Sequence, residues 1–276
     1  MLLSVIVPCY NESDVIEKTW TRLTTVISEN GKKEKCDYEL IFIDDGSKDD
    51  TLAKVEKMAE QDRHVKYISF SRNFGKEAAM YAGLTYASGD GVVIMDADLQ
   101  HPPELIPQMI SRWQDGYDQV ICKRNRKGDK ASKAWSARLY YRLVNHLVDV
   151  EMEDGVGDFR LLSRKAVDAL LSMTEYNRFS KGLFSWIGFK QTFIHYENQA
   201  REGGSSKWSL KRLLQYGIDG IMSFNDKPLR ICFWMGGLLF VFGAIYLTVI
   251  FIQILLHGVD VPGYFTTIFA ILMIGG

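Results

Sequence analysis

G-V-V-I-M-D-A-D-L-Q, residues 91–100, is the stretch of sequence that decides the fold of this chain. It begins with an uninterrupted apolar run and ends with two carboxylates one residue apart, Asp96 and Asp98. A strand buried on both faces of an α/β sheet has this pattern, and ligands bind outside the carboxyl ends of such strands. Carboxylate oxygens bind hard divalent cations, which in turn bind diphosphates. The stretch therefore predicts a buried strand that delivers a cation site to one edge of a sheet.

A polar turn that merely closes the strand is the alternative interpretation of the Asp-x-Asp pattern. A second acidic pair weakens this alternative, because Asp44-Asp45-Gly46-Ser47 ends another apolar run at residues 38–43. The loops that follow parallel strands converge at one edge of the sheet. We therefore expect the two acidic pairs to lie close together.

Strand and helix patterns alternate along the first half of the chain. Apolar runs predict strands at residues 2–8, 38–43, 65–70, 91–95 and 119–122. Amphipathic patterns predict helices at residues 12–28, 51–61, 76–87 and 103–113. Strands that alternate with helices are typical of an α/β fold with a mostly parallel sheet and helices on both faces.

Size and composition limit the possible functions. With 276 residues, 47% of them hydrophobic, the chain can fill one large core and leave residues over at its carboxyl end. Its net charge of -1 provides no global basic field, so we expect no nucleic-acid partner. Cys9, Cys36, Cys122 and Cys232 form no C-x-x-C pair, which argues against a zinc site or a disulfide framework.

Residues 231–256 carry no charge and one strongly polar side chain, Gln253. The run exceeds the roughly 20 residues that cross a bilayer, so we predict a transmembrane helix, with a fully buried core helix as the alternative. Lys227 and Arg230 precede the run, whereas Asp260 follows it. The positive-inside rule therefore places residues 1–230 in the cytoplasm.

A second apolar run, residues 264–276, is too short to span a bilayer alone. We expect the natural chain to continue and complete a helical hairpin, which makes a multi-pass membrane protein; a re-entrant end is the alternative. The predicted domains are a cytoplasmic catalytic domain, 1–225, and a membrane region, 226–276. Gly236-Gly237 and Gly243 allow close helix approach, so a homo-oligomer is a further expectation.

Two other segments, residues 130–150 and 207–224, combine apolar stripes with basic residues. Such patterns are typical of helices that lie in the lipid headgroup region, and a core-facing helix with a solvated basic edge is the alternative. The glycine-rich loop 201–206 is long enough to fold over a bound diphosphate. A lid of this kind excludes water, and a plain connector is the alternative.

Six ordered motifs together resemble those of the family 2 glycosyltransferases. They are P-x-Y-N-E at 8–12, D-D-G-S at 44–47, R-N-F-G-K at 72–76, D-A-D-L-Q at 96–100, G-D-F-R-L at 157–161 and R-x-x-G-x-S-K at 201–207. More narrowly, the chain resembles the polyisoprenyl-phosphate glycosyltransferases, the group of dolichol-phosphate mannose synthase and the bacterial GtrB-type enzymes. This resemblance implies a GT-A fold, a Mg²⁺ or Mn²⁺ ion, a nucleotide-sugar donor and a polyprenyl phosphate acceptor at the membrane surface.

The resemblance also implies roles for single residues. Asp96, Asp98 and Gln100 hold the metal on the diphosphate, and Asp158 is the catalytic base that orients or deprotonates the acceptor. The donor-binding residues that it implies are Pro8, Tyr10, Glu12, Asp44 or Asp45, Lys76, Asp96, Arg201 and Lys207. The residues that it implies for the acceptor phosphate are Arg124, Arg138 and Ser205. A turn acid beside Gly155 and Gly157 is the alternative interpretation of Asp158.

Sugar transfer breaks the bond between the anomeric carbon and the diphosphate, whose developing negative charge a cation can offset. Attack from the opposite face inverts the anomeric centre. A lipid monophosphate carries roughly 1.5 to 2 negative charges near neutral pH, so positioning matters more than base strength. N-F-G-K-E at 73–77 and the G-D-F-R-L-L-S run resemble bacterial enzymes that use UDP-glucose or UDP-N-acetylglucosamine with undecaprenyl phosphate. Their products are lipid-linked sugars for the modification of cell-envelope glycans.

The sequence fits four alternative functions to different degrees. A GDP-mannose-using polyprenyl-phosphate mannose synthase stays open, because one sequence does not reveal the residues that select the sugar. A processive polysaccharide synthase needs a downstream Q-x-x-R-W signature, and the nearest string, at 108–113, has one residue too many. A catalytically silent membrane scaffold conflicts with the intact acids. A dinucleotide-binding dehydrogenase lacks G-x-G-x-x-G after its first strand.

Overall fold

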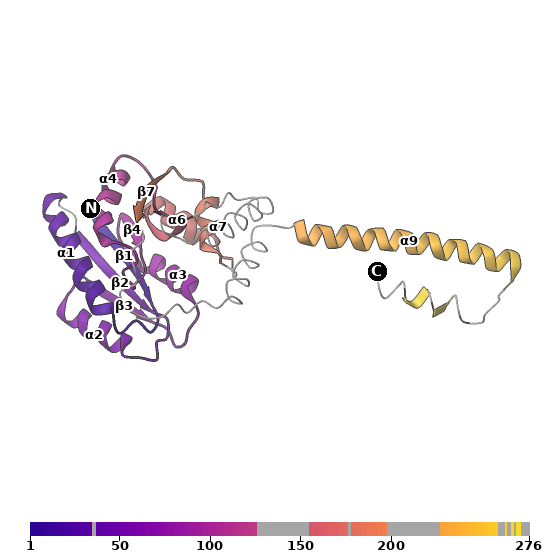
Figure 1. Ribbon diagram of the computed structural model, residues 1–276, viewed down its shortest axis with the longest axis horizontal. Helices are drawn as coiled ribbons and strands as arrows, with labels where there is room; N and C mark the ends of the chain where they lie inside the picture. The colour runs from indigo at the N-terminus through magenta and orange to yellow at the C-terminus, as the bar shows by residue number, and fades with distance from the viewer. Residues whose placement is uncertain are drawn as a thin grey trace. The chain divides into compact units, whose positions relative to one another are not determined.

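The computed structural model describes residues 1–34, 37–125, 155–175, 178–197 and 227–258, together with isolated residues between 263 and 271. The chain divides into two compact units, Met1–Phe224 and Asn225–Gly276 (Figure 1). The first unit contains a sheet covered by helices, and the second contains one long helix.

A seven-stranded sheet in the order β3-β2-β1-β4-β6-β5-β7 forms the centre of the first unit. Its strands are β1 (Leu2–Cys9), β2 (Asp37–Asp44), β3 (Val65–Ser69), β4 (Gly91–Ile94), β5 (Gln119–Asn125), β6 (Val156–Ser163) and β7 (Gln191–Glu197). β6 lies antiparallel between β4 and β5, and every other pair of neighbours in the described sheet is parallel. The predicted α/β fold with a mostly parallel sheet is confirmed.

Helices cover both faces of this sheet, as predicted. They are α1 (Ile16–Glu34), α2 (Thr51–Gln61), α3 (Lys76–Tyr86), α4 (Ile106–Gln114), α6 (Arg164–Ser172) and α7 (Ser180–Trp186). Two helices begin later than the sequence patterns suggest. α1 begins after a turn in which the backbone N–H groups of Asn11 and Glu12 donate hydrogen bonds to the side chains of Ser47 and Thr51. A short 3₁₀ turn, η1 (Pro103–Leu105), precedes α4.

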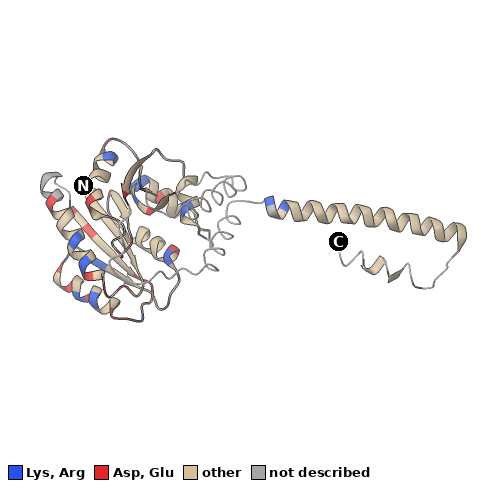
Figure 2. Ribbon diagram, in the orientation of Figure 1, with Lys and Arg blue, Asp and Glu red and all other residues tan. Residues whose placement is uncertain are grey.

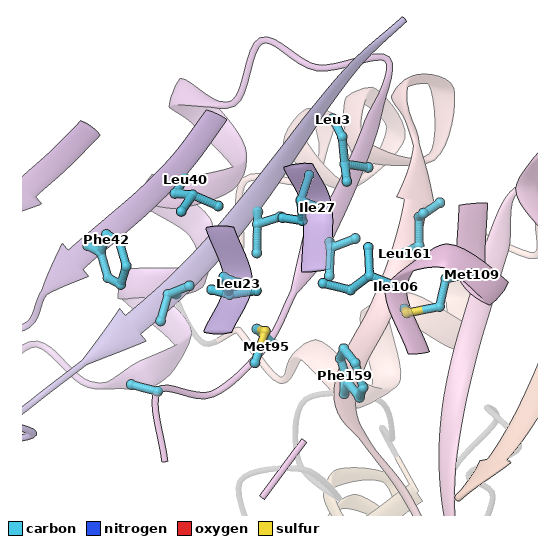
Figure 3. Packing of buried hydrophobic residues seen from close by; sticks show 14 of the residues in the cluster. Leu3, Leu23, Ile27, Leu40, Phe42, Met95, Ile106, Met109, Phe159 and Leu161 are labelled. Carbon is cyan, nitrogen blue, oxygen red and sulfur yellow. The ribbon is translucent and has the colours of Figure 1, made fainter. Parts of the chain in front are cut away.

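The alternation of side chains along each strand builds two hydrophobic layers. Leu3 and Val5 of β1 and Leu40 and Phe42 of β2 pack with residues of α1, α2 and α4. Figure 3 shows this first layer, with residues of α1 and α4 seated against the sheet. The second layer lies on the opposite face, where residues of α3, α6 and α7 pack against the sheet. Continuous apolar strands therefore follow from a sheet that is buried on both faces.

Gly83 is the point at which α3 approaches the sheet most closely. A Cβ there would lie 2.3 Å from Ile6 Cγ2 and 2.9 Å from Ile43 Cδ1. We expect Gly83→Ala to lower the free energy of unfolding by about 1 kcal/mol, because overpacking costs about 1–3 kcal/mol and the better helix propensity of alanine recovers about 1 kcal/mol. Denaturant unfolding of both proteins measures this. Thr85→Ala, on the exposed side of the same helix, is the control, and an unchanged midpoint for Gly83→Ala would contradict the packing.

The second unit contains α9 (Lys227–His257). Figure 2 shows basic residues at its first turn, Lys227 and Arg230, and no further charged residue along the helix. Within α9, the stretch Leu229–His257 is long and apolar enough to cross a membrane, and it is the one such stretch among the described helices. The helix predicted for residues 231–256 lies within it.

Several sequence predictions fall on residues that the structure does not describe. They are the interfacial helices at 130–150 and 207–224, the lid at 201–206 and most of the second apolar run at 264–276.

Candidate active site

The carboxyl ends of the parallel strands lie at one edge of the sheet. Asp44 is the last residue of β2, and Asp96 follows the end of β4 by two residues. The antiparallel strand β6 begins at this same edge. Ile94 pairs with Arg160, and continuing the register places Asp158 opposite Asp96. The reversal of β6 therefore brings an acid from a distant part of the sequence to the acids that end the parallel strands.

Lys76, the first residue of α3, lies between Asp96 and Asp158. Its Nζ is 2.5 Å from Asp96 Oδ1 and donates a hydrogen bond to Asp158 Oδ2 at 2.6 Å. Burial disfavours the charged form of each group, but their mutual attraction is larger. The pKa of Lys76 is therefore raised, and the pKa values of Asp96 and Asp158 are lowered. One ammonium group thus bridges two ionised carboxylates at neutral pH.

Asp158 has further basic neighbours on the α7 side of the sheet. After Lys76, the Lys181 charge in α7 contributes most to lowering the pKa of Asp158 against the effect of burial. The Oδ1 atom of Asp158 is buried, and it has no hydrogen-bond partner among the described residues. This oxygen therefore retains its capacity to accept a proton or a hydrogen bond from a ligand.

Arg160 lies two residues beyond Asp158 on the same face of β6. Its side chain is buried, and its guanidinium carbon lies 3.7 Å from the centroid of the Phe184 ring. Nη2 donates to the carbonyl oxygen of Gly157 at 2.8 Å. Burial lowers the pKa of Arg160 to about 10, so the group keeps its charge at neutral pH. A permanent positive charge thus lies beneath the acid.

The D-D-G-S turn joins the loops of the site. Both oxygens of Asp45 accept hydrogen bonds from the loop before α3: from Phe74 N at 2.7 Å, Gly75 N at 2.9 Å and Asn73 Nδ2 at 2.9 Å. Burial raises the pKa of Asp45, although these bonds oppose the shift. Asp44 is 1% exposed and accepts from Ser47 N within the turn.

The P-x-Y-N-E loop is tied to the other side of this turn. Asn11 N donates to Ser47 Oγ at 2.9 Å, and Lys48 N donates to Asn11 Oδ1 at 2.8 Å. Asn11 has a φ of 51°, a left-handed conformation that asparagine tolerates better than most residues. Glu12 N donates to Thr51 Oγ1 at 2.9 Å. The loops after β1 and β2 therefore form one connected rim.

The D-A-D-L-Q loop presents the acids proposed for a metal. Asp98 is 6% exposed, and its Oδ1 accepts from Gln100 N at 3.1 Å. Leu99 between them has a φ of 57°, which bends the loop sharply. In the part of the chain that the structure describes, no three His, Cys, Asp or Glu side chains gather as a metal site. Asp96 and Asp98 nevertheless fit a Mg²⁺-type cation, which proteins commonly hold with one or two carboxylates and the phosphates of the substrate.

His101 supports the D-A-D-L-Q loop from the opposite face of the sheet. Its ring stacks on Phe159 with centroids 4.9 Å apart, and its Nδ1 accepts a hydrogen bond from Asp96 N at 3.2 Å. Burial lowers the pKa of His101 below its usual value. A neutral imidazole with its proton on Nε2 satisfies both observations. His101 therefore fixes the backbone of Asp96.

The residues that the sequence assigned to the site fall into three groups. The structure brings together Lys76, Asp96 and Asp158 by direct contact, and it links Asp44 and Asp45 to the loop before α3. Pro8, Tyr10, Glu12, Asp98, Gln100 and Arg124 lie on the loops or strand ends of the same edge. Arg138, Arg201, Ser205 and Lys207 lie outside the described residues.

Sequence reasoning missed four residues around these acids: Glu77, His101, Arg160 and Lys181. Two of them carried a usable signal. Glu77 completes the N-F-G-K-E run, and Arg160 shares a strand face with Asp158 because it is two residues away. His101 directly follows the D-A-D-L-Q motif, but no pattern there shows that its ring accepts a hydrogen bond from Asp96 N. Lys181 carried no signal, since only the folded chain places it near Asp158.

The fold and the site define an α/β domain whose ionised acids, bridging lysine and hydrogen-bonded loops gather at the carboxyl edge of the sheet, where α/β domains bind their ligands. Comparison with known protein families identifies two matches. The model of "Glycosyl transferase family 2" matches residues 4–171, and that of "GtrB C-terminal hairpin" matches residues 227–276. The chain belongs to glycosyltransferase family 2 and is an enzyme of that class.

Curated relatives span the whole chain. The "Putative glycosyltransferase CsbB" of Bacillus subtilis is 51% identical over 279 residues, which cover 100% of this chain and 82% of the relative. The "Bactoprenol glucosyl transferase" of Shigella phage SfV is 37% identical over 277 residues, which cover 100% of this chain and 89% of the relative.

A solved structure supports the fold. The mannosyltransferase PcManGT from Pyrobaculum calidifontis, in complex with GDP-Man and Mn²⁺, matches with a TM-score of 0.55 and 19% identity, over 78% of this chain and 62% of that one. At this identity the likeness shows a shared GT-A-type fold.

Proposed function

We propose that this protein transfers a hexose from a nucleotide sugar to a polyprenyl phosphate at a membrane surface, and that glucose is the preferred sugar. The observation that carries the proposal is the meeting of Asp96 and Asp158 on Lys76 at the carboxyl edge of a family 2 domain. Full-length similarity to a bactoprenol glucosyl transferase supports the acceptor and the sugar. UDP is the preferred nucleotide of the donor, and N-acetylglucosamine is the second choice of sugar.

The donor is proposed to lie along the rim formed by the loops after β1 and β2 and to reach the start of α3 and the loop after β4. Pro8, Tyr10, Glu12 and Asp44 or Asp45 lie at the nucleoside end, and Lys76 and Asp96 lie at the diphosphate end. Arg201 and Lys207 remain proposals for the lid over the diphosphate. The hydrogen bonds between these loops support this arrangement, because they fix the loops relative to one another before the donor arrives.

A divalent cation, Mg²⁺ or Mn²⁺, is proposed at Asp96, Asp98 and Gln100. When bound, it would neutralise the charge that develops on the departing diphosphate. Asp158 is proposed as the base or orienting group for the acceptor, which attacks from the opposite face and inverts the anomeric centre. Arg124, Arg138 and Ser205 are proposed to bind the acceptor phosphate, and the position of Arg124 at the end of β5 is compatible with this role.

Association with a membrane is proposed through α9, with the catalytic unit on the cytoplasmic side because Lys227 and Arg230 precede the apolar stretch. A second crossing and hence a multi-pass topology stay a proposal, motivated by the second apolar run at residues 264–276. The domain boundary near residue 225, the interfacial helices at 130–150 and 207–224 and a homo-oligomer stay part of this proposal.

Transfer of radiolabel into lipid tests the function. Full-length protein in vesicles with polyprenyl phosphate and Mn²⁺ is expected to move label from UDP-glucose into the butanol-extractable fraction, with less or no transfer from GDP-mannose. UDP-N-acetylglucosamine and thermal stabilisation by each nucleotide sugar complete the panel. Transfer from GDP-mannose alone would assign the mannose synthase activity, and no transfer from any donor would favour the silent scaffold.

A further inference from the structure

Lys76 occupies a position that the local structure disfavours. It is the first residue of α3, where the aligned peptide dipoles repel a positive charge. Its N-cap is Gly75, with a φ of 97° and no capping side chain. Its ammonium group nevertheless lies within 2.6 Å of both Asp96 and Asp158. Contacts elsewhere must therefore fix the backbone from which this side chain extends.

The segment before Lys76 is held by the D-D-G-S turn. Asp45 accepts hydrogen bonds from two backbone N–H groups and one side-chain amide of residues 73–75, and it is only 4% exposed. Gly46 touches the same segment: a Cβ there would lie 2.4 Å from Arg72 C and 2.8 Å from Asn73 N. These are backbone atoms, which cannot move away by a change of side-chain rotamer. Both residues therefore clamp the loop that leads into Lys76.

The segment after Lys76 is held by α7. Glu77 accepts hydrogen bonds from both the backbone N–H, at 3.1 Å, and the hydroxyl group of Ser180, the first residue of α7. One turn further along α3, Arg178 lies 4.4 Å above the ring of Tyr81 and donates to the carbonyl oxygen of Met173 at 2.6 Å. The start of α3 is therefore fixed to a second helix by contacts on its own surface.

We infer that Asp45 and Glu77 are positioning residues that hold Lys76 between Asp96 and Asp158, Asp45 from the preceding loop and Glu77 from the helix that follows. In this assignment residues 73–77 act together: by fixing Lys76 they set the distance between the proposed metal ligand, Asp96, and the proposed base, Asp158. The inference rests on the proposed function, because it gives those two acids their roles. The same inference predicts the chemical reactivity of the Lys76 amine in protein that holds no substrate.

The first test measures the reactivity of Lys76 in the metal-free full-length protein. A limiting amount of an amine-reactive reagent is added, and modification of each lysine is followed by peptide mass spectrometry. Asp45→Ala and Glu77→Ala are expected to raise the rate at Lys76 several-fold, because the ammonium group leaves its two acids. No nucleotide sugar or lipid is present, so the result does not depend on which sugar the enzyme transfers.

Glu39→Ala is the matched control. Glu39 is also a buried carboxylate, 3% exposed, which accepts hydrogen bonds from Ser4 Oγ, Ser88 N and Lys66 Nζ. It lies in the first half of β2, remote from the end that carries Asp44. We expect this variant to raise the labelling of Lys66 and leave Lys76 unchanged. A general loss of stability would raise the labelling of Lys76 in Glu39→Ala as well, so a change at Lys76 that is confined to Asp45→Ala and Glu77→Ala indicates positioning.

Transfer kinetics supply the second readout. A displacement of about 1 Å in a reacting constellation can cost about 100-fold, so we expect Asp45→Ala and Glu77→Ala to lower kcat by about 10- to 100-fold. KM for the nucleotide sugar should stay unchanged in Glu77→Ala, whereas it can rise in Asp45→Ala, because Asp45 is also proposed at the nucleoside end of the donor. Glu39→Ala keeps kcat. If Asp45→Ala does not fold, Glu77→Ala and Ser180→Ala decide the question. The inference is overturned if Lys76 labels at the wild-type rate in the folded variants, whether or not KM for the nucleotide sugar rises.

Discussion

Asp158→Asn is expected to lower the turnover of sugar transfer by about 100- to 1,000-fold, within the range that general acid–base groups contribute. The asparagine cannot take a proton from the acceptor. It also leaves Asp96 as the one carboxylate at Lys76, since in the wild-type protein the ammonium group of Lys76 pairs with Asp158 Oδ2 at 2.6 Å as well. The Asp158 carboxylate has a lowered pKa, so it is ionised over the pH range of an ordinary assay and the wild-type rate should not fall through protonation of this group near neutrality.

Two measurements on the same variant make this expectation specific. Nucleotide-sugar binding, followed by calorimetry, should stay largely unchanged, because Asp158 is not itself a proposed donor contact and Asp96 still holds Lys76, the donor residue that Asp158 contacts. Asp168→Asn is the matched control: Asp168 is a carboxylate on α6, paired with Arg164 at 3.8 Å and 63% exposed, and its loss should leave turnover intact. If Asp158→Asn keeps most of the turnover with intact donor binding, Asp158 is not the base.

Much of the fold follows from residue patterns that are local. The apolar runs that end at Asp44 and Asp96 identify two central strands, and the alternating pattern of strands and helices identifies the parallel sheet around them. The sharing of one edge by these acids then follows from the geometry of parallel strands. The proposed metal and donor residues could therefore be selected from sequence, and the structure places the described ones along this edge.

The approach of Asp158 to Asp96 could not be derived in the same way. β6 enters the sheet between β4 and β5 against the direction of its neighbours, and no local pattern states the direction of a strand. The positive charges that surround Asp158 also come from separate elements: Lys76 from α3, Lys181 from α7 and Arg160 from β6 itself. The motif resemblance pointed to Asp158, whereas its electrostatic environment is a property of the tertiary structure.

Removal of divalent metal is expected to have the largest effect of all. We expect transfer by chelator-treated protein to fall by about 1,000-fold or more, because a metal at a developing anion contributes several kcal/mol and each 1.4 kcal/mol is a factor of about ten. Mn²⁺ or Mg²⁺ added in excess should restore the rate. Undiminished transfer in the presence of EDTA would contradict the assignment of Asp96 and Asp98 to a cation.

Asp96→Asn tests whether Asp96 binds the cation. Loss of transfer by this variant does not by itself show this, because Asp96 also contacts Lys76. Asp96 is a partner of Lys76 at 2.5 Å, so the substitution also removes one of the two carboxylates at that ammonium group. Binding of Mn²⁺ in the presence of UDP, followed by electron paramagnetic resonance, separates the two causes. We expect Asp96→Asn to abolish this binding and Asp158→Asn to preserve it. Because both variants deprive Lys76 of one carboxylate, equal loss of Mn²⁺ binding in both would assign the effect to the lysine bridge and remove Asp96 from the metal site.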